Sequence, residues 1–310
     1  MSLITFTSAK GSPGVTTLAC VVAAVWPEGR RALVAECDPA GSDIGAWFDL
    51  RRDTGLVSLA TSIAHNGRAN QLPATGGSRL DPHLQALPGG LEVLTGITGP
   101  DQRGLLDGLL PGVCAALAES SSDVICDAGR LAPEPNATMS AVFSSASAAV
   151  LVLRDDARSL DHALAAVTIL RELTDEVVVA IIGGNRAKTA AATQAFGGLR
   201  VAAVAHDPGA AATVTGHAGN PKRFGRSALV ASARELAGEL SAISTAAVPA
   251  MVQSHTDEDL PGARGGARAP RSLGDASARR ADACHDGREH LTRRGGDPNG
   301  SGDGDLVVLR

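Results

Sequence analysis

Aromatic residues and lysines are scarce in this sequence, and each scarcity limits what the protein can do. Phe, Trp and Tyr together make up 2% of the 310 residues, and Tyr is absent. Proteins that bind single-stranded nucleic acid without sequence preference stack the bases on aromatic rings, so this mode of binding is disfavoured. Lysine occurs at three positions, Lys10, Lys188 and Lys222, so a lysine inside a motif is informative. The core must consist of Ala, Val, Leu and Ile.

An excess of charge, a long apolar run and a cysteine motif are also missing. The 28 Lys and Arg against 33 Asp and Glu give a formal net charge of −5, which excludes a strongly basic nucleic-acid coat and an acidic solvating chain. No apolar run reaches membrane-spanning length, and the N-terminus lacks the pattern of a secretory signal. The five cysteines have no CxxC spacing, which argues against a disulfide framework and a zinc or iron–sulfur site. We therefore expect a cytoplasmic protein.

The composition of the chain changes near residue 247. Residues 251–310 are rich in Gly, Arg and Asp and have few apolar positions before the final LVVL. Such a segment cannot bury enough surface to offset the entropy of ordering it. We predict one domain over residues 1–247 and a disordered tail over residues 248–310. Within the domain, the polar, Gly- and Pro-rich stretch 66–90 is expected to be a loop.

Short apolar runs alternate with helix-like segments throughout residues 1–247. The runs are continuously apolar rather than alternating, which is typical of parallel strands buried on both faces. Strands are predicted at residues 3–8, 32–36, 91–96, 123–128, 149–154, 176–182 and 199–205. Helices are predicted at residues 16–26, 55–65, 102–119, 158–173, 188–196 and 227–245. This order predicts an α/β fold: a doubly wound, mostly parallel sheet of about seven strands with helices on both faces.

A glycine-containing turn links the first predicted strand to the first helix, in the sequence AKGSPGVTT. Such a turn aims free backbone N–H groups and the positive end of the helix at one point, which suits a phosphate. Gly11 and Gly14 permit the tight backbone, and a hydroxyl of Thr16 or Thr17 can ligate Mg²⁺. The general phosphate-loop pattern, GxxxxGK[ST], fails where Val15 replaces the lysine and at the first glycine. Taken alone, this motif is also compatible with a turn before a core helix.

What remains, KGxxGxTT, resembles the deviant phosphate loop (deviant Walker A motif) of the MinD/ParA family of P-loop ATPases, whose usual form is KGGxGKTT. In that family the early lysine reaches across a nucleotide-sandwich dimer to the phosphates on the partner subunit, and Lys10 matches it. The resemblance implies that the loop binds the nucleotide through Gly11, Ser12, Pro13, Gly14, Val15, Thr16 and Thr17.

Two later motifs follow in the order of the family. The segment ALVAECDPAGSDIG resembles the first switch, which implies that Asp38 positions the attacking water and belongs to the metal site with Thr16 and Asp127. The segment DVICDAGR resembles the Walker B motif and second switch. There Asp127 would hold the water shell of Mg²⁺, and Gly129 would approach the γ-phosphate. Taken alone, each acid is also compatible with a turn residue.

The resemblance extends over residues 2–246 and implies ATP and Mg²⁺ as cofactors. IIGGNR ends in Asn185, where the family has an asparagine that faces the adenine, and VAHDP places Asp207 and Pro208 on the adenine side. The family further implies an ATP-dependent homodimer that positions or partitions a cargo through a protein partner. In lacking the second lysine of the loop, where Val15 stands, the sequence resembles the TadZ/CpaE-like branch of the family. Members of that branch mark sites of pilus assembly.

The departures from the family pattern concern catalysis. Val15 removes a charge-assisted hydrogen bond to the phosphates, a contact that contributes about 1.5–3 kcal/mol. Pro13 removes a possible N–H donor, and Ser12 restricts the backbone. We therefore expect a protein that binds ATP and Mg²⁺ but hydrolyses ATP slowly or not at all.

Three functions remain open at this point. The first is a nucleotide-switched positioning protein that acts in chromosome partitioning, cell division or pilus positioning. The second is an active ParA-type ATPase that moves DNA, although the 19 basic and 23 acidic residues of the range 1–250 support DNA binding weakly. The third is a pseudo-ATPase scaffold that acts through protein contacts alone. The weakly basic last helix predicts no strong membrane anchor.

Overall fold

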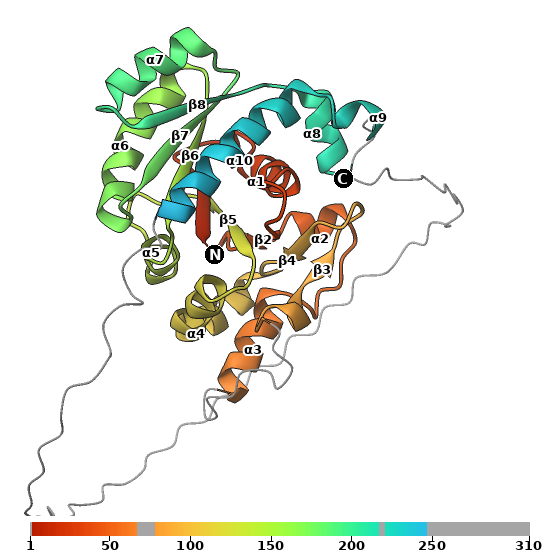
Figure 1. Ribbon diagram of the computed structural model, residues 1–310. Helices are drawn as coiled ribbons and strands as arrows, with labels where there is room; N and C mark the ends of the chain where they lie inside the picture. Colours follow the sequence, from red (N-terminus) through yellow and green to blue (C-terminus); the bar gives the residue numbers. More distant parts are fainter. Residues whose placement is uncertain (1, 67–77, 217–220, 247–310) are drawn as a thin grey trace, which may run out of the picture. The chain divides into compact units, whose positions relative to one another are not determined.

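A single eight-stranded sheet forms the centre of the computed structural model, which describes residues 2–66, 78–216 and 221–246. The strand order is β3-β4-β2-β5-β1-β6-β7-β8 (Figure 1). The strands are β1 (Leu3–Ser8), β2 (Ala32–Glu36), β3 (Gln85–Ala86), β4 (Glu92–Leu94), β5 (Asp123–Arg130), β6 (Ala148–Arg154), β7 (Val177–Ile182) and β8 (Arg200–Val204). Every neighbouring pair is parallel except β3 and β4. The predicted α/β fold is confirmed.

Helices cover both faces of the sheet (Figure 1). One face carries α1 (Val15–Ala24), α8 (Pro208–Val214) and α10 (Ala228–Ala246). The other carries α3 (Leu56–Asn66), α4 (Pro100–Ala118), α5 (Ala137–Ser144), α6 (Ala157–Leu173) and α7 (Arg186–Ala195). Single-turn helices α2 (Ile44–Trp47), α9 (Pro221–Phe224) and the 3₁₀ turn η1 (Asp81–His83) lie in the connections. Among the described residues, no helix is both long and apolar enough to cross a bilayer.

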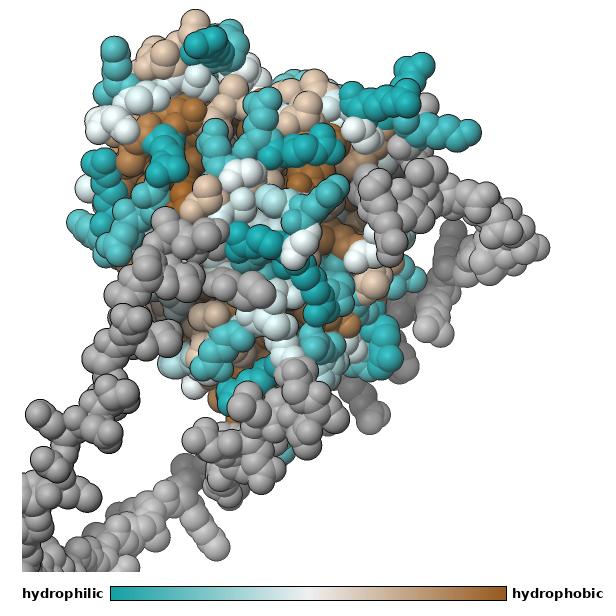
Figure 2. Space-filling model, in the orientation of Figure 1, coloured by the Kyte–Doolittle hydropathy of each residue, from teal (hydrophilic) through white to brown (hydrophobic). Residues whose placement is uncertain are grey.

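The two-sided covering explains why the strands are continuously apolar. In β1, Ile4 and Phe6 pack into the cluster formed with α1 and α10, whereas Leu3 packs into the cluster formed with α3 and α4. Successive side chains of a strand point to opposite faces, so a strand covered on both faces needs apolar residues at every position. The surface in Figure 2 mixes hydrophilic and small apolar areas. Leu164 is the one large hydrophobic side chain of the described residues that is exposed.

The sheet contains one strand more than the sequence predicts. The extra strand, β3, consists of two residues that pair antiparallel with β4 inside the stretch 66–90, which we expected to be a loop. Two residues are too few to show a period, so local patterning does not reveal such a strand. The helices α2, α5, α8 and α9, which have four to eight residues, were also not predicted, because one or two turns give only a weak helical period. Residues 67–77 and the predicted tail lie outside the described residues.

A buried carboxylate fastens the amino-terminal edge of the sheet. Asp123 begins β5 and is fully buried. It accepts hydrogen bonds of 2.9 Å from the Ser2 backbone N–H, the Ser2 hydroxyl and Trp26 Nε1, and an ion pair of 2.7 Å from Arg30. Arg30 also donates to the carbonyl of Ser241 in α10 at 3.1 Å. Burial by itself would raise the pKa of Asp123, but these donors outweigh it and the pKa is lowered.

We expect Asp123→Ala to lower the free energy of unfolding by about 3–5 kcal/mol, because the substitution removes the carboxylate that neutralises the largely buried Arg30 guanidinium. The measurement is urea unfolding at neutral pH. Asp123→Asn, which keeps one acceptor oxygen without the charge, should lose less stability. Asp161→Ala, at an exposed position of α6, is the matched control. Equal stability of the Asp123→Ala and Asp161→Ala proteins would contradict the assignment.

Candidate phosphate-binding site

Residues 9–14 form an open loop between β1 and α1. Gly11 has a φ of +77° and Gly14 a φ of +104°, a region that residues with a side chain rarely adopt. Gly14 is the N-cap of α1 and offers no side chain to the first turn. Lys10, Gly11 and Ser12 are exposed. The loop therefore presents the uncapped positive end of a buried helix to solvent, which is the arrangement that binds anions.

Val15, at the position of the usual lysine, does not face the loop. Its side chain is buried in the core cluster that α1 shares with α10. Pro13, in the middle of the loop, is also buried. Val15 can therefore contact a ligand through its backbone N–H only. The one cation within the loop itself is Lys10.

Asp127 lies beside Thr16 of α1, near the carboxyl end of β5. Its buried carboxylate accepts hydrogen bonds from the Thr16 hydroxyl and from the Gly129 N–H, the latter at 2.9 Å. Burial, with the nearby charges of Asp38 and Glu36, raises the pKa of Asp127 to about 6 despite these hydrogen bonds. The structure thus brings together Thr16 and Asp127, two of the three predicted metal residues.

Asp38 follows β2, the strand next to β5, and lies against the second predicted switch. The Ala40 N–H donates to its carboxylate at 2.7 Å. Gly129 has a φ of +61° and approaches so closely that a Cβ atom there would overlap the Asp38 carboxylate. Burial raises the pKa of Asp38, and Asp43 adds to this effect. Glycine at position 129 is therefore required both by the backbone and by this contact.

Glu36 holds the first predicted switch in place, a role that its sequence position did not reveal. It ends β2 opposite Asp127 in the strand register and is buried. Its carboxylate accepts hydrogen bonds from the Ser42 hydroxyl, from the N–H groups of Asp43 (2.9 Å) and Ile44 (2.8 Å), and from that of Gly96 (3.2 Å). Burial raises its pKa in spite of these donors. Glu36 therefore ties the segment after Asp38 to the end of β4.

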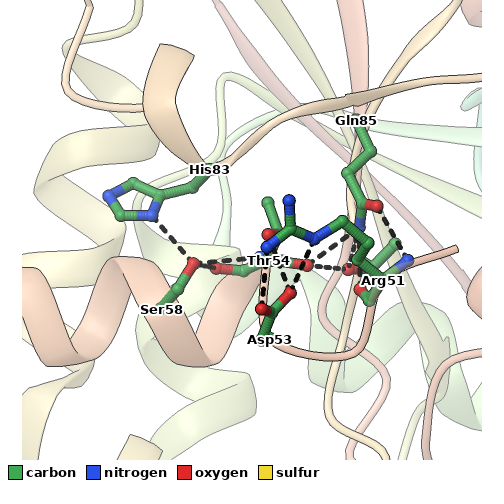
Figure 3. A network of polar contacts seen from close by, with 8 residues as sticks. Arg51, Asp53, Thr54, Ser58, His83 and Gln85 are labelled. Atoms are coloured by element: carbon green, nitrogen blue, oxygen red, sulfur yellow. Dashed lines mark hydrogen bonds and ion pairs between the residues drawn. The ribbon is translucent and has the colours of Figure 1, made fainter.

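The segment that follows α2 is fastened to β3 by the side chain of Gln85 (Figure 3). The Gln85 amide nitrogen donates to the carbonyls of Arg51 (3.0 Å) and Thr54 (2.9 Å), and its oxygen accepts from the Arg51 N–H at 2.9 Å. The Ser58 hydroxyl lies 2.8 Å from Nδ1 of His83, whose pKa is lowered by burial. The short strand β3 thus fastens the segment between α2 and α3, which lies outside the predicted motifs.

The residues predicted on the adenine side lie at the ends of β7 and β8. The Asn185 side chain caps α7 by accepting from the Lys188 N–H at 3.1 Å. Asp207 caps α8 by accepting from the Ala210 N–H at 3.0 Å, and Pro208 is the first residue of that helix. These residues share the carboxyl edge of the sheet with the phosphate loop. Their contact with an adenine stays a prediction.

Two arginines at this edge were missed by the sequence reasoning. Arg103 of α4 donates to the Pro39 carbonyl, and its charge partly offsets the raised pKa of Asp38. Arg154 ends β6, and its guanidinium lies 3.5 Å from the carbonyl oxygen of Ser12 in the phosphate loop. The position of Arg154 directly after an apolar strand run is a signal that could have found it. No such signal marks Arg103.

The oxygens around Thr16 suit Mg²⁺ in the presence of phosphate. In the described part of the chain, no three or more His, Cys, Asp or Glu side chains are arranged to hold a metal by themselves. Mg²⁺ is usually held by one or two protein oxygens together with phosphate oxygens and water. The Thr16 hydroxyl and the Asp127 carboxylate, which interact with each other, fit this requirement.

In P-loop α/β proteins the phosphate loop lies between a parallel strand and the helix that follows it, which is the position of residues 9–14 here. Comparison with solved structures identifies chains that share the fold. A ParA family ATPase from Chlorobium tepidum matches with a TM-score of 0.60 and 16% identity, over 76% of this chain and 98% of that one. MinD from Pyrococcus furiosus matches with a TM-score of 0.59 and 18% identity, over 78% and 99%.

MinD from Pyrococcus horikoshii, complexed with Mg-ADP, matches with a TM-score of 0.57 and 17% identity, over 80% of this chain and 99% of that one. No protein-family model and no curated protein sequence matches the chain. The described domain therefore has the fold of the ParA and MinD ATPases.

Asp127 should make the stability of the unliganded protein depend on pH. Because its pKa is raised from 3.8 to about 6, the folded protein retains a proton that the unfolded chain releases. The free energy of unfolding should therefore fall as pH rises from about 4 to about 6, by about 3 kcal/mol from this group. Asp127→Asn should remove this part of the pH dependence in urea unfolding between pH 4 and pH 8.

Asp161→Asn, at an exposed position, is the control and should keep the profile of the wild-type protein. An Asp127→Asn protein with an unchanged profile would show that another group titrates in this range.

Proposed function

We propose that this chain is a MinD/ParA-type nucleotide switch that binds ATP with Mg²⁺ at the end of α1. The observation that carries the proposal is the convergence of Thr16, Asp38, Asp127 and Gly129 beside the open phosphate loop. These residues come from three segments of the chain and meet at one point. Burial together with mutual repulsion raises the pKa of Asp127, so a bound cation would relieve an unfavourable arrangement.

Each residue has a definite task in this proposal. Thr16 and Asp127 would hold Mg²⁺, which supplies charge neutralisation for the phosphates. The backbone N–H groups at the start of α1 would bind the phosphates through the loop glycines. Asp38 would orient a water molecule, and Gly129 leaves the room that Asp38 occupies. The fold of a MinD complexed with Mg-ADP supports this assignment.

Hydrolysis is proposed to be slow or absent. The side chain of Val15 lies in the core, so the first turn of α1 has no side-chain cation for the developing negative charge. Pro13 supplies no N–H group to the loop. Both substitutions weaken stabilisation of the transition state more directly than they weaken nucleotide binding, which retains the backbone donors and the helix end.

The biological task that we propose is the positioning or partitioning of a cargo by an ATP-dependent homodimer. Lys10 is exposed at the start of the loop, where it can extend toward the phosphates of a second copy. Solved structures with this fold include a ParA family ATPase and a cell division ATPase. The buried Val15 favours a second candidate, a scaffold that has lost nucleotide binding.

Titration of Mg²⁺–ATP into the full chain by calorimetry distinguishes the two candidates. We expect a micromolar dissociation constant for the wild-type protein. Thr16→Ala should weaken binding about tenfold or more, because it removes a metal ligand and a partner of Asp127. Thr61→Ala, on the exposed face of α3, is the matched control. Absence of binding to the wild-type protein at millimolar ATP would establish the scaffold instead.

Lys10→Ala should prevent dimer formation by ATP while leaving the binding of ATP to the monomer within a few-fold. Sedimentation with and without Mg²⁺–ATP measures the dimer, and phosphate release should remain below about 1 s⁻¹, at the low end for enzymes. Arg171→Ala is the control for loss of a positive charge. A Lys10→Ala protein that dimerises like the wild type would contradict the role of Lys10.

Salt-sensitive, ATP-dependent retention of duplex DNA would identify DNA as the cargo.

A further inference from the structure

The phosphate loop has few positive charges for a ligand as anionic as a nucleoside triphosphate. The first turn of α1 contains no basic residue, and Val15 is buried in the core. On the β5 side of the loop stand three carboxylates, those of Glu36, Asp38 and Asp127, whose charges would repel an anion. One Mg²⁺ leaves a triphosphate with net negative charge. A further cation is therefore expected from outside the loop.

Arg154 lies on the opposite side of the loop from these carboxylates. Strand β6 pairs in parallel with β1, with Leu151 opposite Thr7, whereas β5 pairs with the other edge of β1. The end of β6 and the start of the loop after β1 therefore emerge at the same edge of the sheet. The guanidinium of Arg154 is exposed and lies 3.5 Å from the Ser12 carbonyl at the tip of the loop.

The two acidic residues that follow Arg154 are engaged elsewhere. Asp155 forms an ion pair with Lys188 of α7. Asp156 caps α6, accepting from both the N–H and the hydroxyl of Ser159 at 2.8 Å. Within the described residues, no carboxylate forms an ion pair with Arg154. Its charge thus remains available beside the loop even though two acids adjoin it in the sequence.

We propose that Arg154 binds the polyphosphate of Mg²⁺–ATP and supplies the positive charge that is missing at position 15. A guanidinium is suited to this role because it donates two parallel hydrogen bonds to a phosphate and stays charged at every physiological pH. Approach from the β6 side leaves the carboxylates and the metal position undisturbed. This inference rests on the proposed function, since it assumes that the loop binds a nucleotide.

The test is calorimetric titration of Mg²⁺–ATP, and separately of inorganic tripolyphosphate with Mg²⁺, into the full chain. Arg154→Ala should weaken the binding of both about tenfold to a hundredfold, the range expected for loss of a charge-assisted contact. Arg154→Lys, which keeps the charge without the two-pronged geometry, should lose less. Arg171→Ala, an exposed arginine at the far end of α6, should bind like the wild type. Because Arg154 is exposed, its replacement should leave the melting temperature unchanged, which separates loss of binding from unfolding.

The outcomes separate this inference from the function on which it rests. If the wild-type and Arg154→Ala proteins bind both probes equally well, Arg154 is not a phosphate ligand, and the proposed nucleotide switch stands. If the wild-type protein binds neither probe, the proposed function and this inference both fail. Selective loss of binding in Arg154→Ala, with Arg171→Ala unaffected, supports the inference.

Discussion

The burial of three carboxylates at the ends of β2 and β5 is the constraint on which the candidate site depends. Because these strands are neighbours, Glu36 and Asp127 stand opposite each other, and Asp38 is held against Gly129. Each carboxylate is stabilised differently: Glu36 by three backbone N–H groups, Asp127 by Thr16, and Asp38 by Ala40. The raised pKa values of all three acids show that these donors do not fully compensate for burial.

The carboxylates near the two ends of β5 differ in how well their surroundings stabilise the charge. At its start, Asp123 accepts hydrogen bonds from three residues, which link β1, the segment after α1 and α10. Near its other end, Asp127 is buried, and the charges of Asp38 and Glu36 add to the effect of burial on its pKa. A protein can retain such an unfavourable site only if the rest of the structure determines the fold strongly. Stability at the amino edge thus permits an unfavourable cluster of buried acids at the carboxyl edge.

In the phosphate loop, the backbone and the side chain at position 15 have different surroundings. Gly11 and Gly14 keep the conformation that exposes the end of α1, although the side chain at position 15 now belongs to the core. In the proposed switch, the backbone of the loop and the cations Lys10 and Arg154 share the binding of phosphate.

The sequence by itself determined the layered fold and the line of motifs along one edge. Continuous apolar runs predicted seven of the eight strands, because the burial of both faces leaves a local signature. The phosphate loop, Asp38 and Asp127 were predicted because the motifs that contain them resemble those of the MinD/ParA family and follow apolar strand runs. The strand β3, the anchoring role of Glu36, the burial of Val15 and the contact of Arg154 with Ser12 were decided only by the tertiary structure. These features depend on which strands become neighbours: β1 lies between β5 and β6, which are more than a hundred residues away in the chain. Local periodicity carries no information about such pairings, because they are selected by the packing of the whole sheet and its helices.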